Sequence, residues 1–427
     1  MERYDRYKDS GIEWIGEIPS NWKILPLKYC YNFKTGFTPD TKQYEYYDPN
    51  GYDWATISDL GGSEIRNTET RISQRFVDEF NPVPILKGSL LYSFKLSAGK
   101  VAFAGKDLFT NEAIASFLPN NPCLCFLKYS SYLISFAANE NIYGAKLLNA
   151  SLIKNALMVF PPISVQEKIA SFLDEKTSVI DSLIQKNEKS IELLQDYRKS
   201  VISEAVTKGL DPNVPMKDSG AEWIGEIPKT WGVFRNKLLF KLRDERNTQP
   251  LSKVNLLSLY TDLGVVQHKD LTKTTGNKAT NANGYKVVYP SDIVVNIILC
   301  WMGAIGVSAY SGVVSPAYDV YSAKRLINPK YYHYLFRTKQ FGDECYLFGR
   351  GIMQMRWRVY SDQFLNIKVP CPDYSTQCLI VDYLDQKTSE IDSLIEKKKQ
   401  LVEKLQEYRR SLISECVTGK VKVPGVE

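Results

Sequence analysis

The side chains that most often carry catalysis are sparse in this chain of 427 residues. Its only histidines, His268 and His333, lie in unlike sequence contexts, so a histidine-dependent site would exist in one half of the chain only. The sequence has no Walker A loop, no Gly-x-Gly-x-x-Gly after a strand pattern and no His-Glu-x-x-His. The segment FGRG at 348–351 lacks the Lys-Ser/Thr continuation of a phosphate-binding loop and is interpreted as an ordinary loop. We therefore predict no catalytic residues.

The eight cysteines are scattered, with no Cys-x-x-Cys and no Cys/His cluster of the kind that binds zinc. This pattern predicts free, mostly buried thiols in a reducing compartment and no metal site. The N-terminal MERYDRYKDS is charged without an apolar core, and the chain has no uninterrupted apolar run of about 18 residues. We expect a cytoplasmic protein without a membrane span.

Side chains suited to nucleic acid are better supplied. Arg and Lys fit phosphates and guanine edges, and Asn and Gln fit adenine. The segment GRGIMQMRWR at 349–358 concentrates three Arg, one Gln and one Trp. For each single residue, the alternative is an ordinary solvated surface position. The candidate DNA-binding residues are Lys34, Thr35, Thr38, Arg66, Arg71, Lys95 and Lys100 in the first half and Arg243, Arg246, Lys273, Arg350, Gln354, Arg356 and Arg358 in the second.

Two repeats define the elements that must position these residues. DSGIEWIGEIPSNW at 9–22 returns as DSGAEWIGEIPKTW at 218–231, and we call this segment the entrance motif. A longer segment at 166–208 returns at 377–419 with almost the same offset. A period of about 210 residues is too long for a solenoid, so it indicates two domains of one type. We expect the first entrance motif to lie beside the end of the last helix.

The longer repeat predicts a helix, because it holds no internal Pro or Gly and alternates its apolar residues at spacings of 3 and 4. Each helix would be about 60 Å long, with a stripe too narrow to stand alone. We predict that the two copies form an intramolecular antiparallel coiled coil; the alternative is two helices that each dock only on their own domain. The predicted core residues are Ile180, Ile184, Ile191, Leu194, Ile391, Ile395, Val402 and Leu405.

The segments at 23–160 and 232–370, called here the first and second variable domains, share little sequence but a common order of short strands, a helical stretch and a last strand before the long helix. This order predicts an α+β fold with a mixed or mostly antiparallel sheet in each domain. The net charge of the chain is +6, and the basic excess lies outside the two long helices. Such a mild excess is weak support for nucleic acid when taken alone.

Together these features resemble the specificity (S) subunits of type I restriction–modification enzymes over nearly the whole chain. The resemblance is carried by the two entrance motifs and by a Pro-rich strand that leads into a long helix, as in FPPISVQEKIASFLDEKTSVIDSLI. Further carriers are KTGFTPDTKQYEYYDPNGYDWATISDLGG in the first half and VVNIILCWMGAIGVSAYSGVVSPAYDVY in the second. The resemblance implies target-recognition domains at 1–160 and 211–370 and conserved long helices at 161–210 and 371–427.

The resemblance further implies a subunit without chemistry of its own. Each recognition domain would read one half of a bipartite sequence in double-stranded DNA, and the helices would fix the gap between the half-sites. Two methyltransferase subunits and two restriction subunits would be the partners. S-adenosylmethionine, ATP and Mg²⁺ would be bound by those partners, with no cofactor in this chain. The alternatives are a stand-alone nuclease and a coiled-coil scaffold without a DNA role.

Overall fold

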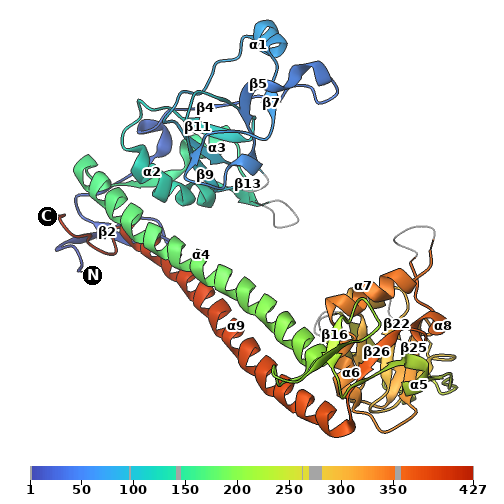
Figure 1. Cartoon of the computed structure of the whole chain (residues 1–427). Helices are drawn as coiled ribbons and strands as arrows, with labels where there is room; N and C mark the ends of the chain where they lie inside the picture. Colours follow the sequence, from blue (N-terminus) through green and yellow to red (C-terminus); the bar gives the residue numbers. More distant parts are fainter. Residues whose placement is uncertain are drawn as a thin grey trace. The chain divides into compact units, whose positions relative to one another are not determined.

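The computed structural model describes residues 2–95, 98–140, 146–261, 263–268, 281–351 and 357–426. It divides into two compact units, unit 1 (Met1–Asn187 with Leu401–Glu427) and unit 2 (Glu188–Gln400), both coloured along the chain in Figure 1. Each unit contains one variable domain and one part of each long helix. The boundary between the two compact units therefore falls within the long helices. The boundaries expected from the sequence instead separate each variable domain from its helix.

The two long helices are α4 (Ile163–Lys208) and α9 (Tyr374–Val417), and each begins three residues before the repeated segment. Within each unit they lie side by side and antiparallel (Figure 1). This confirms the predicted antiparallel pairing of the two copies. The predicted core positions face inward: Ile180, Ile391, Ile395 and Val402 are buried, and Ile184, Ile191, Leu194 and Leu405 are half-buried. The apolar stripe of each helix is removed from water only where another apolar surface covers it. Here the stripe of the other long helix provides that surface.

The first variable domain is built on a five-stranded mixed sheet with the strand order β4-β11-β8-β9-β6. Within this sheet, β6 and β9 pair in parallel, and the other described pairings are antiparallel. A second sheet has three strands in the order β10-β5-β7, and helix α1 (Gln74–Phe80) directly follows its strand β7. The strands are β3 (Lys23–Pro26), β4 (Phe33–Thr35), β5 (Tyr47–Ala55), β6 (Glu64–Ile65), β7 (Arg71–Ile72), β8 (Leu90–Ser93), β9 (Val101–Ala104), β10 (Phe109–Thr110), β11 (Ile114–Phe117), β12 (Asn139–Glu140), β13 (Lys146–Leu147) and β14 (Leu157–Phe160).

Two short helices complete this domain, α2 (Leu124–Ser130) and α3 (Ala150–Asn155). Asn149 caps α3, since its side-chain oxygen accepts a hydrogen bond from the amide of Leu152 at 2.9 Å. Strand β14 pairs with β3 and leads into α4, as the repeated strand–helix pattern predicts. The α+β character expected from the sequence is confirmed in this domain.

The second variable domain has a four-stranded antiparallel sheet, β18-β25-β22-β23. Its strands are β17 (Gly232–Arg235), β18 (Phe240–Arg243), β19 (Leu257–Tyr260), β20 (Gly264–Gln267), β21 (Lys286–Val288), β22 (Ile293–Asn296), β23 (Ile305–Val307), β24 (Gly312–Val314), β25 (Tyr318–Ala323) and β26 (Lys368–Cys371). Its helices are α5 (Asn236–Leu239), α6 (Pro329–Leu335), α7 (Lys339–Phe348) and α8 (Ser361–Phe364). Strand β26 pairs with β17 and leads into α9, in the same way as β14 leads into α4.

Each entrance motif, together with the two residues before it, forms the same antiparallel hairpin. The strands are β1 (Tyr7–Asp9) and β2 (Glu17–Pro19) in unit 1, and β15 (Met216–Asp218) and β16 (Glu226–Pro228) in unit 2. In unit 1, Ile18 and Trp22 are fully buried in one cluster with Cys416 of α9. The ammonium group of Lys420, which follows α9, donates a hydrogen bond to the backbone carbonyl of Glu17 at 2.7 Å, so this motif lies beside the end of the last helix, as expected.

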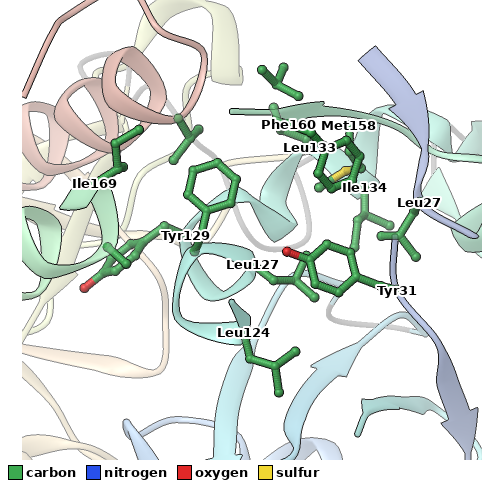
Figure 2. Packing of buried hydrophobic residues seen from close by; sticks show 14 of the residues in the cluster. Leu27, Tyr31, Leu124, Leu127, Tyr129, Leu133, Ile134, Met158, Phe160 and Ile169 are labelled. Atoms are coloured by element: carbon green, nitrogen blue, oxygen red, sulfur yellow. The ribbon is translucent and has the colours of Figure 1, made fainter. Parts of the chain in front are cut away.

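The main core of unit 1 joins the variable domain to the helices. Figure 2 shows Leu27 and Tyr31 after β3, Leu127 and Tyr129 of α2, and Ile169 of α4 gathered in this cluster. Apolar burial on this scale provides most of the free energy that holds a domain to its helix. All eight cysteines fall within the described ranges and are free thiols, of which Cys125 is exposed. Among the helices in those ranges, none is long and apolar enough to cross a membrane.

Candidate DNA interface

A cleft of about 530 Å³ lies at the β4 edge of the five-stranded sheet. Lys34 and Thr35 of β4 line it, and Lys154 of α3 faces the same space. Both lysines are exposed and form no ion pair with any residue in the described ranges. Apolar walls with unpaired ammonium groups suit a polyanion that also presents apolar surface, as nucleic acid does. Sequence reasoning identified Lys34 and Thr35 but missed Lys154, because only the packing of α3 brings it to this edge.

Two further candidates of the first domain converge on one carboxylate. The hydroxyl of Thr38 donates a hydrogen bond to Glu112, and the ammonium group of Lys95 lies 3.6 Å from the other oxygen of the same side chain. Both side chains of the ion pair are about half exposed to solvent. A phosphate near Lys95 would therefore compete with Glu112 in a solvated setting, where ion pairs are weak.

Arg66 and Lys100 lie on the exposed surface of the first domain. Arg66 follows β6 and forms a 2.8 Å ion pair with Glu64. Lys100 precedes β9, and its backbone amide donates to the hydroxyl of Ser93 at 3.0 Å. Its side chain has no ionic partner within the described part of the chain, which leaves its charge available to a phosphate.

Arg71 differs from these candidates, because it contributes to a half-buried charge cluster. Its guanidinium lies 3.4 Å from Asp53, which also pairs with Lys106 and accepts a hydrogen bond from the hydroxyl of Thr68 at 3.1 Å. Burial alone would raise the pKa of Asp53, but the hydrogen bonds from Lys106 and Thr68 outweigh it and hold the pKa below its ordinary value. The geometry gives Arg71 a structural role in addition to any contact with DNA.

Arg243 of the second domain is similarly committed to its own fold. Its guanidinium makes a bidentate pair with the buried Asp292, at 2.9 and 3.1 Å, and lies 4.8 Å from the ring centre of Tyr289. Such a paired, stacked guanidinium is well fixed and has few donors left for a ligand. Arg246 is more exposed and forms a 2.5 Å ion pair with Asp244.

The Arg-rich segment at 349–358 is described at its two ends. The backbones of Arg350 and Arg358 exchange two hydrogen bonds, of 2.8 and 3.0 Å, and form an isolated antiparallel bridge. Between them Trp357 stacks on Tyr346 at 5.0 Å and donates its indole N–H to the Tyr346 carbonyl. The structure thus brings the backbones of Arg350 and Arg358 together. Lys273, Gln354 and Arg356 lie outside the described residues.

The two histidines occupy different environments. His333 is half-buried and its Nδ1 accepts a hydrogen bond from the amide of Val307 at 3.2 Å; loss of hydration of the ring, together with the charges of Arg337 and Lys330, lowers its pKa to about 3. It is therefore neutral at physiological pH and serves the packing of α6 on β23. His268 contacts the hydroxyl of Ser258 at 3.1 Å in a hairpin. Both histidines belong to unit 2, and unit 1 has none.

The long helices carry one matched pair of contacts that the sequence pattern did not single out. In unit 1, Arg409 of α9 makes a bidentate ion pair with Asp181 of α4, at 2.8 and 3.2 Å. In unit 2, Arg198 of α4 pairs with Asp392 of α9 at 2.9 and 3.1 Å. Each Asp and each Arg stands at the same position of the repeat as its counterpart. The duplication therefore preserved not only the apolar seam but also the polar contact that fixes its register.

A profile of the type I restriction modification DNA specificity domain matches residues 19–193 and again residues 228–404. The chain belongs to this family. Each match begins at the proline that ends the entrance hairpin, Pro19 or Pro228, and ends within a long helix. The unit of this specificity family is therefore one variable domain with the first part of its helix, present twice. The resemblance drawn from the sequence motifs is confirmed.

Relatives and solved structures agree with this membership. The putative type I restriction enzyme MjaX specificity subunit of Methanocaldococcus jannaschii is 25% identical, with 98% of each chain aligned. The MjaVIII specificity subunit of the same organism is 22% identical, over 98% of this chain and 97% of the relative.

A chain solved in a study of assembly and conformational transition of the type I R-M system superposes with a TM-score of 0.68 at 12% identity, over 95% of this chain and 99% of the other. The HsdS subunit from Thermoanaerobacter tengcongensis gives a TM-score of 0.53 at 13% identity, over 95% and 98%. At such identities the solved structures show a shared fold, and the predicted fold class is confirmed.

Proposed function

We propose that this chain is the DNA-reading, non-catalytic subunit of a type I restriction–modification complex, and that each variable domain reads one half of a bipartite, asymmetric DNA sequence. The observation that carries the proposal is the contrast between a duplicated framework and two unlike surfaces. The hairpins, the seam and the ion pairs of the helices repeat, whereas the cations of the two variable domains do not correspond. Two unlike readers on one repeated framework suit a sequence with two different halves.

The exposed cations support a division of labour between the domains. In the first domain, Lys34, Lys100 and Lys154 have no ionic partner in the ranges described, which suits contacts to phosphates. In the second domain, the backbones of Arg350 and Arg358 pair, and the sequence between them also contains Gln354 and Arg356. Arginine and glutamine are the side chains that best read guanine and adenine edges in the major groove.

We propose that the paired helices set the distance between the half-sites. The bidentate pairs Asp181–Arg409 and Arg198–Asp392 support a fixed register, because sliding either helix by one turn would break both contacts of a pair. An ion pair that is partly exposed adds little stability, so its contribution here is geometric specificity.

The helices also offer a repeated surface for partner subunits. Leu183 and Leu394 are exposed at one matched pair of repeat positions, and Tyr197 and Tyr408 at another. A surface displayed twice suits two copies of one partner, and we propose that two methyltransferase subunits dock there. Two restriction subunits would complete the complex. S-adenosylmethionine, ATP and Mg²⁺ would be bound by these partners, and the methyltransferase would flip the target adenine out of the duplex.

Exchanging residues 23–160 for the first variable domain of another family member tests the proposal. The chimaera, assembled with its methyltransferase subunit, should methylate a sequence in which only one half has changed, as read by sequencing of modified DNA. A change in both halves would contradict independent reading. Gel-shift measurements at low salt, where phosphate contacts are strongest, test the alternative of a scaffold without a DNA role. Absence of binding by the chain alone and by the complex would refute the proposed function.

A further inference from the structure

Each variable domain is tied to a long helix by one carboxylate that receives two donors. In unit 1, Asp174 of α4 accepts a hydrogen bond from the hydroxyl of Tyr129 at 2.5 Å and from the ammonium group of Lys128 at 2.8 Å, both from α2. In unit 2, Asp385 of α9 accepts from the hydroxyl of Tyr334 at 2.7 Å and from the ammonium group of Lys330 at 2.5 Å, both from α6.

The acceptors correspond in sequence, and the donors correspond only in part. Asp174 and Asp385 stand at the same position of the repeated helix, within LDEKTS and LDQKTS. Tyr129 and Tyr334 are each the sixth residue after the N-cap of their helix. The lysines differ, because one directly precedes its tyrosine and the other lies a full helical turn before it.

Two domains that share little sequence thus form the same contact, with the lysine donor at different positions relative to the tyrosine. A solvated salt bridge formed by chance would not be expected to recur with the same acceptor, the same hydroxyl donor and a relocated ammonium donor. The recurrence indicates that the contact itself is required, and not merely the residues around it.

The setting of the contact indicates what it does. Beneath the carboxylate of unit 1, Leu127 of α2 and Ile169 and Leu173 of α4 belong to one apolar cluster, and Figure 2 shows Leu127, Tyr129 and Ile169 within it. Apolar contact is non-directional, so it holds the two surfaces together without fixing the angle between them. Hydrogen bonds to a carboxylate weaken steeply when the donor leaves its line, so they fix that angle.

The environment also favours a persistent contact. The ring of Tyr129 is buried, and its hydroxyl lies 3.1 Å from the hydroxyl of Thr177, one helical turn after Asp174. Burial, followed by the hydrogen bond to Asp385, raises the pKa of Tyr334 to about 12, so this hydroxyl keeps its proton at physiological pH. Thr388 occupies the position of Thr177 in the second copy.

We propose that Asp174 and Asp385 are positioning residues, each of which orients one variable domain on its helix and thereby controls the reading of one half-site. A domain fits this framework when its first helix after the sheet presents a tyrosine hydroxyl and a lysine ammonium group to that carboxylate. The inference rests on the proposed function, since it concerns how the two readers are aimed.

The test uses the full chain assembled with its methyltransferase subunit, carrying Asp174→Asn or Asp385→Asn. Methylation is measured on a DNA library with single-base changes in each half-site. Asp174→Asn should lower discrimination against mismatches about tenfold in one half-site and leave the other unchanged, since charge-assisted contacts are typically worth this much. Asp385→Asn should affect the opposite half-site. Glu175→Gln is the matched control, because the second copy already has Gln386 at that position.

The outcomes separate the inference from the function on which it rests. If the unmodified complex shows no base discrimination, the proposed function fails. Suppose instead that the unmodified complex discriminates between bases. If Asp174→Asn then leaves discrimination unchanged in both half-sites, or lowers it equally in both, the positioning role is wrong. Should Asp174→Asn assemble poorly, Tyr129→Phe removes one donor and keeps the buried ring, and it must produce the same one-sided loss. Asp174→Glu, which keeps the carboxylate, should restore part of the discrimination.

Discussion

Replacing Gly419 by alanine should destabilise unit 1 more than replacing Gly209 by alanine destabilises unit 2. Both glycines follow the end of a long helix and have left-handed backbones, with φ of +73° and +80°. They differ in their surroundings. A methyl group on Gly419 would overlap the ring of Pro19, with Cγ at 2.7 Å, and would lie 2.9 Å from Cζ3 of Trp22. On Gly209 it would lie 3.3 Å from the ring of Trp231, a contact that a small shift relieves.

The expected magnitudes follow from two separate costs. A left-handed backbone costs an alanine about 1–2 kcal/mol at either position. The overlap at Gly419 adds roughly 1–3 kcal/mol, because Trp22 is fully buried and cannot move aside without disturbing the core. We therefore expect a loss in the free energy of unfolding of about 1–2 kcal/mol for Gly209→Ala and about 2–5 kcal/mol for Gly419→Ala.

Urea unfolding of the full chain, followed by tryptophan fluorescence, measures both variants against the unmodified protein. Adding Pro19→Ala to Gly419→Ala removes the proline ring atoms that the new methyl group overlaps, and it should recover part of the loss. Equal losses for the two glycine variants, or a larger loss for Gly209→Ala, would refute the steric reasoning. So would a double variant no more stable than Gly419→Ala alone.

Two further outcomes are expected. Inserting four residues into both long helices, after Asn187 and after the matched Lys398, keeps both bidentate ion pairs in register and should lengthen the framework by about 6 Å. The gap between methylated half-sites should lengthen with it, whereas an insertion of four residues after Pro212 should leave the gap unchanged; an unchanged gap in the first case would show that the helices do not set the spacing. Because burial lowers the pKa of His333 to about 3, the unfolded chain binds a proton below about pH 6.5 that the folded chain does not, so stability is complete above that pH and decreases as the pH falls toward 3. Unfolding at pH 7 and pH 4.5 should show a smaller loss for His333→Gln than for the unmodified chain, and equal losses would contradict this assignment.

The entrance motif shows how far sequence reasoning reaches at the level of single residues. Ile15, Ile18 and Trp22 are buried beside the end of α9, as their repetition near each domain suggested. Trp14 of the same motif is 41% exposed, and its ring stacks on Phe136 of the variable domain with the ring centres 3.9 Å apart. A motif without a regular period gives no information about which face each aromatic ring takes.

The candidate DNA-binding residues fall into two groups, those held in ion pairs within their own domain and those that are not, and residue type alone does not tell the groups apart. Residue type identified cations suited to phosphates, but Arg243 forms an ion pair with Asp292, and Arg71 forms one with Asp53 on the neighbouring strand. Lys154, which faces the cleft beside Lys34, escaped notice because it belongs to a short helix far from β4 in sequence. Whether a cation is paired depends on partners that only packing brings together.

By itself the sequence determined the duplicated architecture, the two long helices and the seam along which they pair, because repetition and helical period are properties of a linear pattern. It also determined the family, through motifs that recur at a fixed offset. Only the tertiary structure decided that Asp181 pairs with Arg409, that Asp174 and Asp385 each receive a tyrosine and a lysine, and which basic residues remain unpaired. These contacts join residues far apart in the chain, and their geometry depends on side-chain packing that no local period records.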